Sequence, residues 1–180
     1  MELKTTRLIL RPFSLNDFEA MHEFASDLQN VEHMDWGPNT EEQSRSFLRE
    51  VQDSHKNPDP GEYNFAVTVG ATGQLIGSAS IWIESKPNKR GGFGYILNKK
   101  FWRKGYGEET AQELLRFGFQ DLRLHRVAAT CAPSNAASKG LLEKIGMHLE
   151  GHLRQNIFHR DAWRDSLLFS ILDSEWKPKA

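Results

Sequence analysis

The sequence has few of the features that mark secreted, membrane-bound or nucleic-acid-binding proteins. Its single cysteine, Cys131, excludes an internal disulfide and favours a reducing compartment such as the cytoplasm. Its 23 Lys and Arg residues nearly balance its 24 Asp and Glu residues, which disfavours nucleic acid as a partner. No segment approaches the roughly 20 apolar residues of a membrane span, and the first residues lack the apolar run of a signal peptide. We therefore expect a cytoplasmic protein with no membrane or nucleic-acid partner.

Metal-binding patterns are also missing from the sequence. His148 and His152 are four residues apart, but they fall in a segment expected to be extended, where this spacing does not bring both rings together as it does on a helix. No cluster of cysteines or carboxylates completes a site, so we expect no metal. Cys131 follows an apolar segment and is expected to be a small core residue. A Cys–His nucleophile is the less favoured alternative.

The apolar residues that are present are sufficient for one folded domain. Hydrophobic residues make up 38% of the chain and aromatic residues 11%, and 180 residues is a usual length for one domain. The sequence contains no internal repeat, linker or low-complexity stretch. We therefore expect a single domain that spans residues 1–180.

The spacing of the apolar residues predicts both strands and helices. Segments typical of strands lie at residues 8–10, 65–69, 75–83, 93–97, 127–131, 148–155 and 163–172. Helical spacing is found at residues 14–28, 40–54, 107–119 and 135–145, and the first two segments begin with capping signals. This order predicts an α/β fold of the α+β type, in which about four helices flank a mixed sheet of about seven strands.

A basic, glycine-rich segment joins the fourth expected strand to the third expected helix. It reads Arg103-Lys104-Gly105-Tyr106-Gly107. Glycines let backbone N–H groups approach an anion, and the start of a helix adds unpaired N–H donors and the positive end of its dipole. The segment therefore predicts a cradle for a phosphate-bearing ligand. The alternative is an ordinary turn whose charges face solvent.

Two common nucleotide-binding motifs do not fit this segment. The dinucleotide-binding pattern Gly-x-Gly-x-x-Gly needs a third glycine, but Thr110 occupies that position, and no acidic residue follows the next expected strand. A Walker A loop needs Gly-Lys followed by Ser or Thr, which this segment lacks. A nucleotide-dependent oxidoreductase is therefore a weaker alternative, and the residues by themselves do not name the ligand.

Several segments in the same order resemble one enzyme family. Residues 101–109, which read Phe-Trp-Arg-Lys-Gly-Tyr-Gly-Glu-Glu, resemble the acetyl-CoA loop of the GNAT superfamily. The resemblance is closest to the branch of the ribosomal-protein N-terminal acetyltransferases RimJ and RimL. Further segments resemble that branch at residues 6–12, 75–77, 135–147, 150–154 and 163–166, so the resemblance covers nearly the whole chain. It departs at Trp102, where many members of the superfamily have Gln or Arg.

The resemblance implies a single GNAT-type domain that moves an acetyl group from acetyl-CoA to a primary amine. Direct attack within a ternary complex is the implied mechanism. The pantetheine arm would lie along Tyr95, Ile96 and Leu97 and pair with their backbone as an added strand does. Backbone amides from Arg103 to Gly107 would hold the pyrophosphate. The amine would belong to a small molecule or to a protein N-terminus, and the enzyme would be a monomer or a homodimer.

Two polar residues near the start of the last expected helix are candidates for catalysis. Asn135 and Ser138 are three residues apart and can share one face of a helix. By resemblance, Asn135 would bond the pantetheine arm or nearby backbone, and Ser138 would protonate the departing thiolate. Such general-acid help typically contributes about 10²–10⁴ in rate. Without the resemblance, Asn135 is explained as a helix cap and Ser138 as a surface hydroxyl.

The general base is the least defined part of the expected site. Some relatives have a carboxylate within segments equivalent to residues 93–98 or 154–158, but neither contains one in this chain. The remaining candidates are Asp35, Glu84 and His159, each otherwise a solvated surface group, and a water chain to solvent is the alternative. We expect Trp36 and Glu84 to contact the acceptor. The missing carboxylate also leaves open an acetyl-CoA sensor without turnover.

Overall fold

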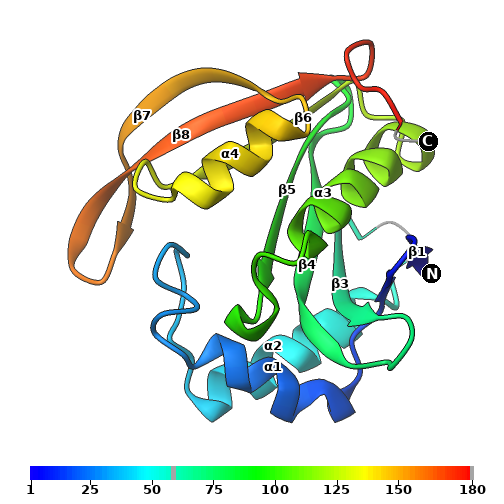
Figure 1. Ribbon diagram of the computed structural model, residues 1–180, viewed down its shortest axis with the longest axis vertical. Helices are drawn as coiled ribbons and strands as arrows, with labels where there is room; N and C mark the ends of the chain where they lie inside the picture. The colour runs from blue at the N-terminus through cyan, green and yellow to red at the C-terminus, as the bar shows by residue number, and fades with distance from the viewer. Residues whose placement is uncertain (58–59, 179–180) are drawn as a thin grey trace.

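The computed structural model describes residues 1–57 and 60–178, and its framework is one mixed sheet (Figure 1). Within these residues the sheet has eight strands in the order β1-β2-β3-β4-β5-β6-β8-β7. All neighbouring strands are antiparallel except β5 and β6, which are parallel. The predicted α/β domain with a mixed central sheet is therefore confirmed.

Most strands lie where the apolar segments predicted them. They are β1 Leu3–Lys4, β2 Leu8–Arg11, β3 Glu62–Val69, β4 Leu75–Ser85, β5 Arg90–Leu97, β6 Arg126–Cys131, β7 His148–His159 and β8 Ala162–Leu172. The prediction missed β1, because two residues are too few to show an alternation. It also began the fourth strand at residue 93. The strand begins at Arg90 because Gly91 and Gly92 have no apolar side chain that would mark it.

The four α-helices of the described chain are α1 Phe18–Ala25, α2 Glu41–Ser54, α3 Tyr106–Arg116 and α4 Ala136–Lys144. Helices α1 and α2 lie together at the bottom of the view in Figure 1. The first helix is shorter than predicted. A 3₁₀ turn at Leu15–Asp17 precedes it, and Leu28 lies beyond its end with 60% of its surface exposed. The predicted third helix ends its regular part at Arg116 and continues as a π-helical turn, Phe117–Asp121.

Apolar cores fill both faces of the sheet. One core packs α3 and α4 on the sheet, and the other packs α1 and α2 on the opposite face. Strand β5 contributes to both, because successive side chains point to opposite faces. Leu97 enters the α3 core and Ile96 enters the α1 core, each less than a tenth exposed. Burying such a side chain stabilises a fold by about 1.5–3 kcal/mol, so β5 is fixed from both sides.

Strands β5 and β6 separate in the middle of the sheet. They pair only from Arg90 opposite Arg126 to Gly92 opposite Ala128. Beyond that point β6 stays paired with β8, while β5 continues beside β4. Gly92 lies at the point of separation, where a Cβ atom would stand 2.7 Å from the Trp82 ring. The close approach of that ring therefore requires glycine at this position.

Candidate active site

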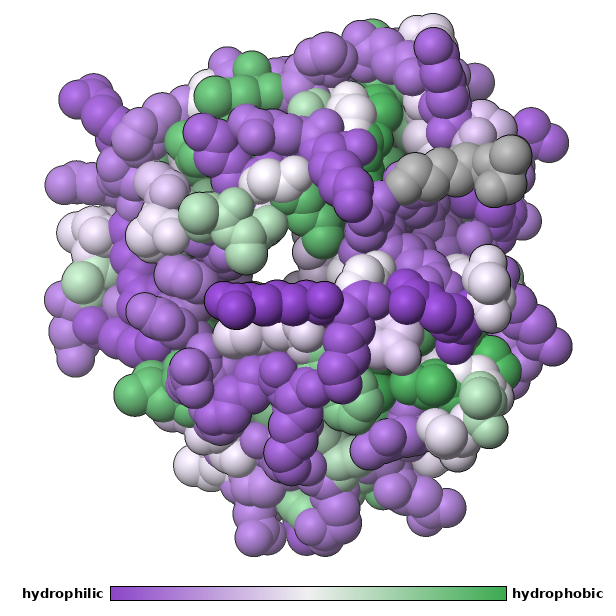
Figure 2. Space-filling model, in the orientation of Figure 1, coloured by the Kyte–Doolittle hydropathy of each residue, from purple (hydrophilic) through white to green (hydrophobic). Residues whose placement is uncertain are grey.

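A cavity of about 540 Å³ opens where β5 and β6 separate. Its walls come from β4, β5, β6, the start of α4, β8 and the loop between α1 and α2. Figure 2 shows an opening in the molecular surface on this face. Pockets that hold small ligands measure about 300–1,000 Å³, so this cavity is large enough for a substrate.

One edge of β5 faces the cavity with backbone groups that no neighbouring strand uses. The N–H of Asn98 donates to the carbonyl of Ile76 in β4 at 2.8 Å. Because backbone groups alternate along a strand, those of Ile96 point toward β4 and those of Tyr95 point to the other edge. In the described chain no strand pairs with that edge beyond Gly92. Tyr95 therefore has an N–H and a carbonyl available for an extended ligand.

The turn after β5 is tied to the strand by Trp102. Its indole N–H donates to the Leu97 carbonyl oxygen at 2.8 Å, and the same oxygen accepts from the Asn30 side-chain amide at 3.0 Å. A carbonyl has two lone pairs, so both acceptor positions of Leu97 are used within the protein. Any backbone contact of Leu97 with a ligand is thus limited to its N–H. Trp102, at the position where many members of the superfamily have Gln or Arg, therefore has a structural role.

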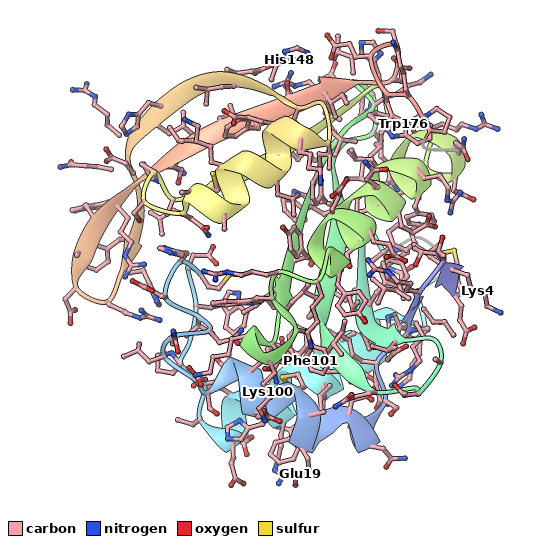
Figure 3. The ribbon with its side chains drawn as sticks, in the orientation of Figure 1. Lys4, Glu19, Lys100, Phe101, His148 and Trp176 are labelled. Atoms are coloured by element: carbon pink, nitrogen blue, oxygen red, sulfur yellow. The ribbon has the colours of Figure 1, made fainter. Side chains whose placement is uncertain are left out.

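The same turn rests on α1. The ammonium of Lys100 pairs with the carboxylate of Glu23 at 2.5 Å, and Figure 3 shows Lys100 and Phe101 directly above that helix. The ammonium of Lys104 lies 5.0 Å from the centre of the Phe101 ring, a cation–π distance. These contacts fix the chain where it enters the basic, glycine-rich segment.

The segment itself forms an exposed turn at the start of α3. Arg103 and Gly105 have left-handed φ values of 59° and 80°, and glycine adopts this conformation without strain. Gly105 is the N-cap of α3, so the N–H groups of Tyr106 and Gly107 lie in the first helical turn, where no intrahelical partner exists. The side chains of Arg103 and Lys104 are exposed and add positive charge. This geometry suits a phosphate group.

Two acidic residues in the first turn of α3 would repel an anion if they were unpaired. The carboxylate of Glu108 pairs with Lys144 at 2.6 Å, and that of Glu109 pairs with Arg7 at 2.7 Å. Each negative charge is therefore balanced by a cation from elsewhere in the chain. The turn keeps its positive character.

Residues at the start of α4 line the opposite side of the cavity. Asn135 caps the helix, since its side-chain oxygen accepts from the Ser138 N–H at 3.0 Å, and both residues line the cavity. The Ser138 side chain lies close enough to the Cys131 thiol to influence its pKa. Burial raises the pKa of the Cys131 thiol, and Ser138 opposes this only in part. Cys131 is therefore a neutral thiol and a poor nucleophile.

The side chain of Tyr95 packs against the α3 core next to the cavity that this residue lines. Its ring lies against the start of α3, where a Cβ atom on Gly107 would stand 3.2 Å from it. Burial raises the pKa of Tyr95 well above its usual range, with a further contribution from Cys131. The hydroxyl therefore stays protonated and remains a hydrogen-bond donor. The sequence analysis considered only the backbone of Tyr95 and missed this side chain.

The far end of the cavity is formed by the loop between α1 and α2. Trp36 and Asp35 line it, together with His33. Trp36 is half-buried and packs against the α1 core, so its ring is a fixed apolar wall. The predicted position of Trp36 beside an acceptor is compatible with this place in the cavity.

The hairpin of β7 and β8 holds this loop in place. The guanidinium of Arg160, between the two strands, donates to the carbonyls of Val31 and Gly37 at 3.2 and 3.1 Å. Arg164 on β8 donates to the carbonyl of Glu32 at 3.1 Å. Figure 1 shows the end of the hairpin close to the loop. The two segments together close one side of the cavity.

Carboxylates outnumber cations among the residues that line the cavity. Asp35, Glu62 and Asp165 line the cavity, whereas Arg164 is the cation among its lining residues. The backbone N–H of Gln155 and the side chain of His152 hydrogen-bond the Asp165 carboxylate and lower its pKa. Asp165 therefore stays negatively charged at neutral pH. The cavity lining therefore favours a positively charged group.

The sequence model of the acetyltransferase (GNAT) domain matches residues 7–148. This chain belongs to the GNAT acetyltransferase family. It is 32% identical over 176 residues to the uncharacterized N-acetyltransferase YnaD of Bacillus subtilis, covering 98% of this chain and 99% of that protein. A crystal structure of a GNAT-family acetyltransferase from Bacillus anthracis matches with a TM-score of 0.85 and 35% identity, over 97% of this chain and 100% of that one.

A relative with a named acceptor supports the RimJ/RimL-like branch. The ribosomal protein uS5-alanine N-acetyltransferase of Escherichia coli is 29% identical over 85 residues, which are 47% of this chain and 44% of that protein. The predicted family and enzyme class are therefore confirmed. The chain is an acetyl-CoA-dependent N-acyltransferase, and the alternative of a nucleotide-dependent oxidoreductase is excluded.

Two candidates from the sequence do not reach the cavity of this GNAT domain. Glu84 is exposed at the end of β4 that pairs with the start of β5, and its charge acts on Arg126. His159 lies next to the hairpin turn, and its Nε2 atom is buried without a hydrogen-bond partner in the described structure. Neither lines the cavity, so we do not retain them in the site. Asp35 does line it.

The carboxylates of Glu62 and Asp165 were missed by the sequence analysis. They come from the first residue of β3 and from β8, and only the folded chain brings them into the same cavity as Asp35. No local pattern marks either of them.

Among residues 1–57 and 60–178, no group of three His, Cys, Asp or Glu side chains could hold a metal ion. His152 bonds Asp165 at 2.7 Å instead. None of the helices described is long and apolar enough to cross a membrane.

Proposed function

We propose that this enzyme transfers the acetyl group of acetyl-CoA to a primary amine by direct attack in a ternary complex. The observation that carries the proposal is the free edge of β5, which faces a cavity that continues to the loop between α1 and α2. Thioester and amine can therefore meet in one space. In this proposal the pantetheine arm lies along Tyr95, Ile96 and Leu97, and residues 103–107 hold the pyrophosphate.

The reaction needs one proton removed and one proton supplied. The amine nitrogen attacks the thioester carbonyl carbon, the resulting oxyanion collapses, and the C–S bond breaks to release a thiolate. We assign Ser138 as the donor to the thiolate, because its hydroxyl lies at the cavity wall. Asn135 positions Ser138 through the bond to its backbone N–H. The protonated phenol of Tyr95 is a second donor in the same cavity.

The acceptor is expected to carry a positive charge next to an apolar body. The carboxylates that line the cavity attract an ammonium group, and Trp36 offers an apolar wall. At pH 7 an α-amine with a pKa of about 8 is roughly one-tenth neutral, whereas a lysine amine with a pKa of about 10.4 is neutral in roughly one molecule in 2,500. Because residues 93–98 and 154–158 contain no carboxylate that could act as a strong base, an amine of low pKa is favoured. Asp35 or a water chain takes its proton.

A thiol-release assay with matched amines tests this proposal. We expect turnover with primary amines, on small molecules or at peptide N-termini, and lower kcat/KM when a carboxylate is attached beside the same amine. The substrate carboxylate would be repelled by the carboxylates that line the cavity, which explains the lower kcat/KM. Calorimetry with acetyl-CoA accompanies the assay. Micromolar binding without acetylation of any amine would support the alternative, a sensor without turnover, for which the missing carboxylates in residues 93–98 and 154–158 argue.

A further inference from the structure

A group of side chains outside the cavity joins the turn between β1 and β2 to the first turn of α3. We call Thr5, Arg7 and Glu109 the Arg7 latch. Arg7 donates to the Glu109 carboxylate twice, from its backbone N–H and from Nε, each at 2.7 Å. The Thr5 hydroxyl donates to the same carboxylate at 2.5 Å. The Glu109 side chain is 16% exposed, whereas the Arg7 side chain is 46% exposed.

Arg7 also contacts three successive residues of the glycine-rich turn. Its Nη1 atom donates to the carbonyl of Lys104 at 2.9 Å. Its guanidinium lies over the Tyr106 ring, 4.6 Å from the ring centre. A Cβ atom on Gly105 would stand 3.2 Å from Nη2. One side of the guanidinium is thus packed against the turn.

The bond from Arg7 to Lys104 determines where the next N–H points. In a trans peptide the carbonyl and the following N–H point in opposite directions. Holding the Lys104 carbonyl toward Arg7 therefore turns the Gly105 N–H away from Arg7. This N–H belongs to the segment that the proposed function assigns to the pyrophosphate.

We propose that Arg7 is a positioning residue of the pyrophosphate cradle, and that Glu109 and Thr5 hold it in place. The proposal rests on the proposed function for the location of the pyrophosphate. Arg7 acts by orienting the Lys104–Gly105 peptide and not by lending its charge to the ligand. Glu109 already neutralises that charge: although burial opposes it, the hydrogen bonds from Thr5 and Arg7 lower the pKa of Glu109 and keep it ionised.

Substitution of Glu109 separates a positioning role of Arg7 from a direct charge contact with the ligand, because the two roles predict opposite changes in acetyl-CoA affinity. Glu109→Gln releases the guanidinium. A positioning role predicts that acetyl-CoA binds about tenfold more weakly, with the KM of the amine unchanged. A direct contact with phosphate predicts equal or tighter binding, because a negative charge near the ligand has been removed. Calorimetry with acetyl-CoA measures this, and unchanged or tighter binding would overturn the proposal.

Substitutions of Arg7 give an independent readout. We expect Arg7→Lys to bind acetyl-CoA nearly as weakly as Arg7→Met, since an ammonium keeps the charge but cannot reproduce the fork of hydrogen bonds. Full rescue by lysine would also overturn the proposal. Arg49→Met is the matched control, because it breaks an exposed pair with Glu42 on α2. Thr5→Val tests the latch if the Glu109 variant does not fold.

The outcomes for the latch and for the proposed function are distinguishable. The latch is judged by acetyl-CoA binding, and the proposed function by acetylation. Binding without acetylation in the unmodified enzyme removes the proposed transfer and leaves the latch testable. If the unmodified enzyme binds no acetyl-CoA, both proposals fail.

Discussion

At the scale of single residues, the site depends on a few polar atoms held by their neighbours. Ser138 is the clearest example. Its backbone N–H is bonded to the Asn135 side chain, and its hydroxyl takes no part in that bond. The helix cap therefore does not depend on the hydroxyl, so the hydroxyl can be removed without disturbing the cap.

We predict that Ser138→Ala lowers kcat by about 10²-fold and changes the Kd for acetyl-CoA little. The reason is that the hydroxyl serves the departing thiolate, which exists only late in the reaction. Steady-state kinetics and calorimetry measure the two quantities. Ser134→Ala, an exposed serine in the turn before α4, is the control. A normal kcat for Ser138→Ala would remove Ser138 from the mechanism and leave Tyr95 as the donor.

At the scale of secondary-structure elements, the position of β5 matters most for the proposed cofactor site. Its side chains are fixed in two cores, and its last carbonyl is bonded to Trp102 and Asn30. The strand and the turn that follows it therefore move as one unit. An extended ligand along β5 and its phosphates on the turn would be kept at a constant separation.

We predict that Trp102→Phe weakens acetyl-CoA binding by about two- to tenfold and leaves kcat nearly unchanged. The substitution removes one hydrogen bond, which is worth about 0.5–1.5 kcal/mol, and keeps an aromatic ring. Calorimetry gives the Kd, and thermal unfolding reports on stability. Trp163→Phe is the control, since that ring lies 60% exposed in β8. Equal affinity in both variants would show that the indole does not align the turn.

At the scale of the whole molecule, the cavity is assembled from segments far apart in the sequence. The loop between α1 and α2 and the hairpin of β7 and β8 close it together. Arg160 reaches across 123 residues to the carbonyl of Gly37. The shape of the acceptor end therefore depends on contact between the two halves of the chain.

We predict that Arg160→Met raises the KM of the amine several-fold and leaves the Kd of acetyl-CoA unchanged. It leaves the carbonyls of Val31 and Gly37 without their charged donor, and hydrogen bonds to charged groups contribute about 1.5–3 kcal/mol. Faster hydrogen exchange in residues 31–39 would report the loosened loop. Arg154→Met, on the same hairpin, is the control. A change confined to acetyl-CoA affinity would contradict this division of the cavity.

Local sequence was sufficient for most of the secondary structure. The capping box at Thr40 and Gln43 is formed as predicted, with bonds of 3.3 and 2.8 Å. Such signals act over three or four residues, so they can be seen without the fold. The sequence pattern failed to predict a strand where the strand is very short, as in β1. It also failed where a strand lacks apolar side chains, as at Gly91 and Gly92 in β5.

By itself, the sequence determined the order of the elements, the family and the position of the glycine-rich turn. Each of these depends on residues that are close together in the chain. The tertiary structure decided which of the candidate acids reach the cavity. It kept Asp35, left Glu84 outside the cavity lining and added Glu62 and Asp165. The pairing of Arg7 with Glu109, 102 residues apart, was also decided by the fold, because no local pattern carries information about contacts between distant segments.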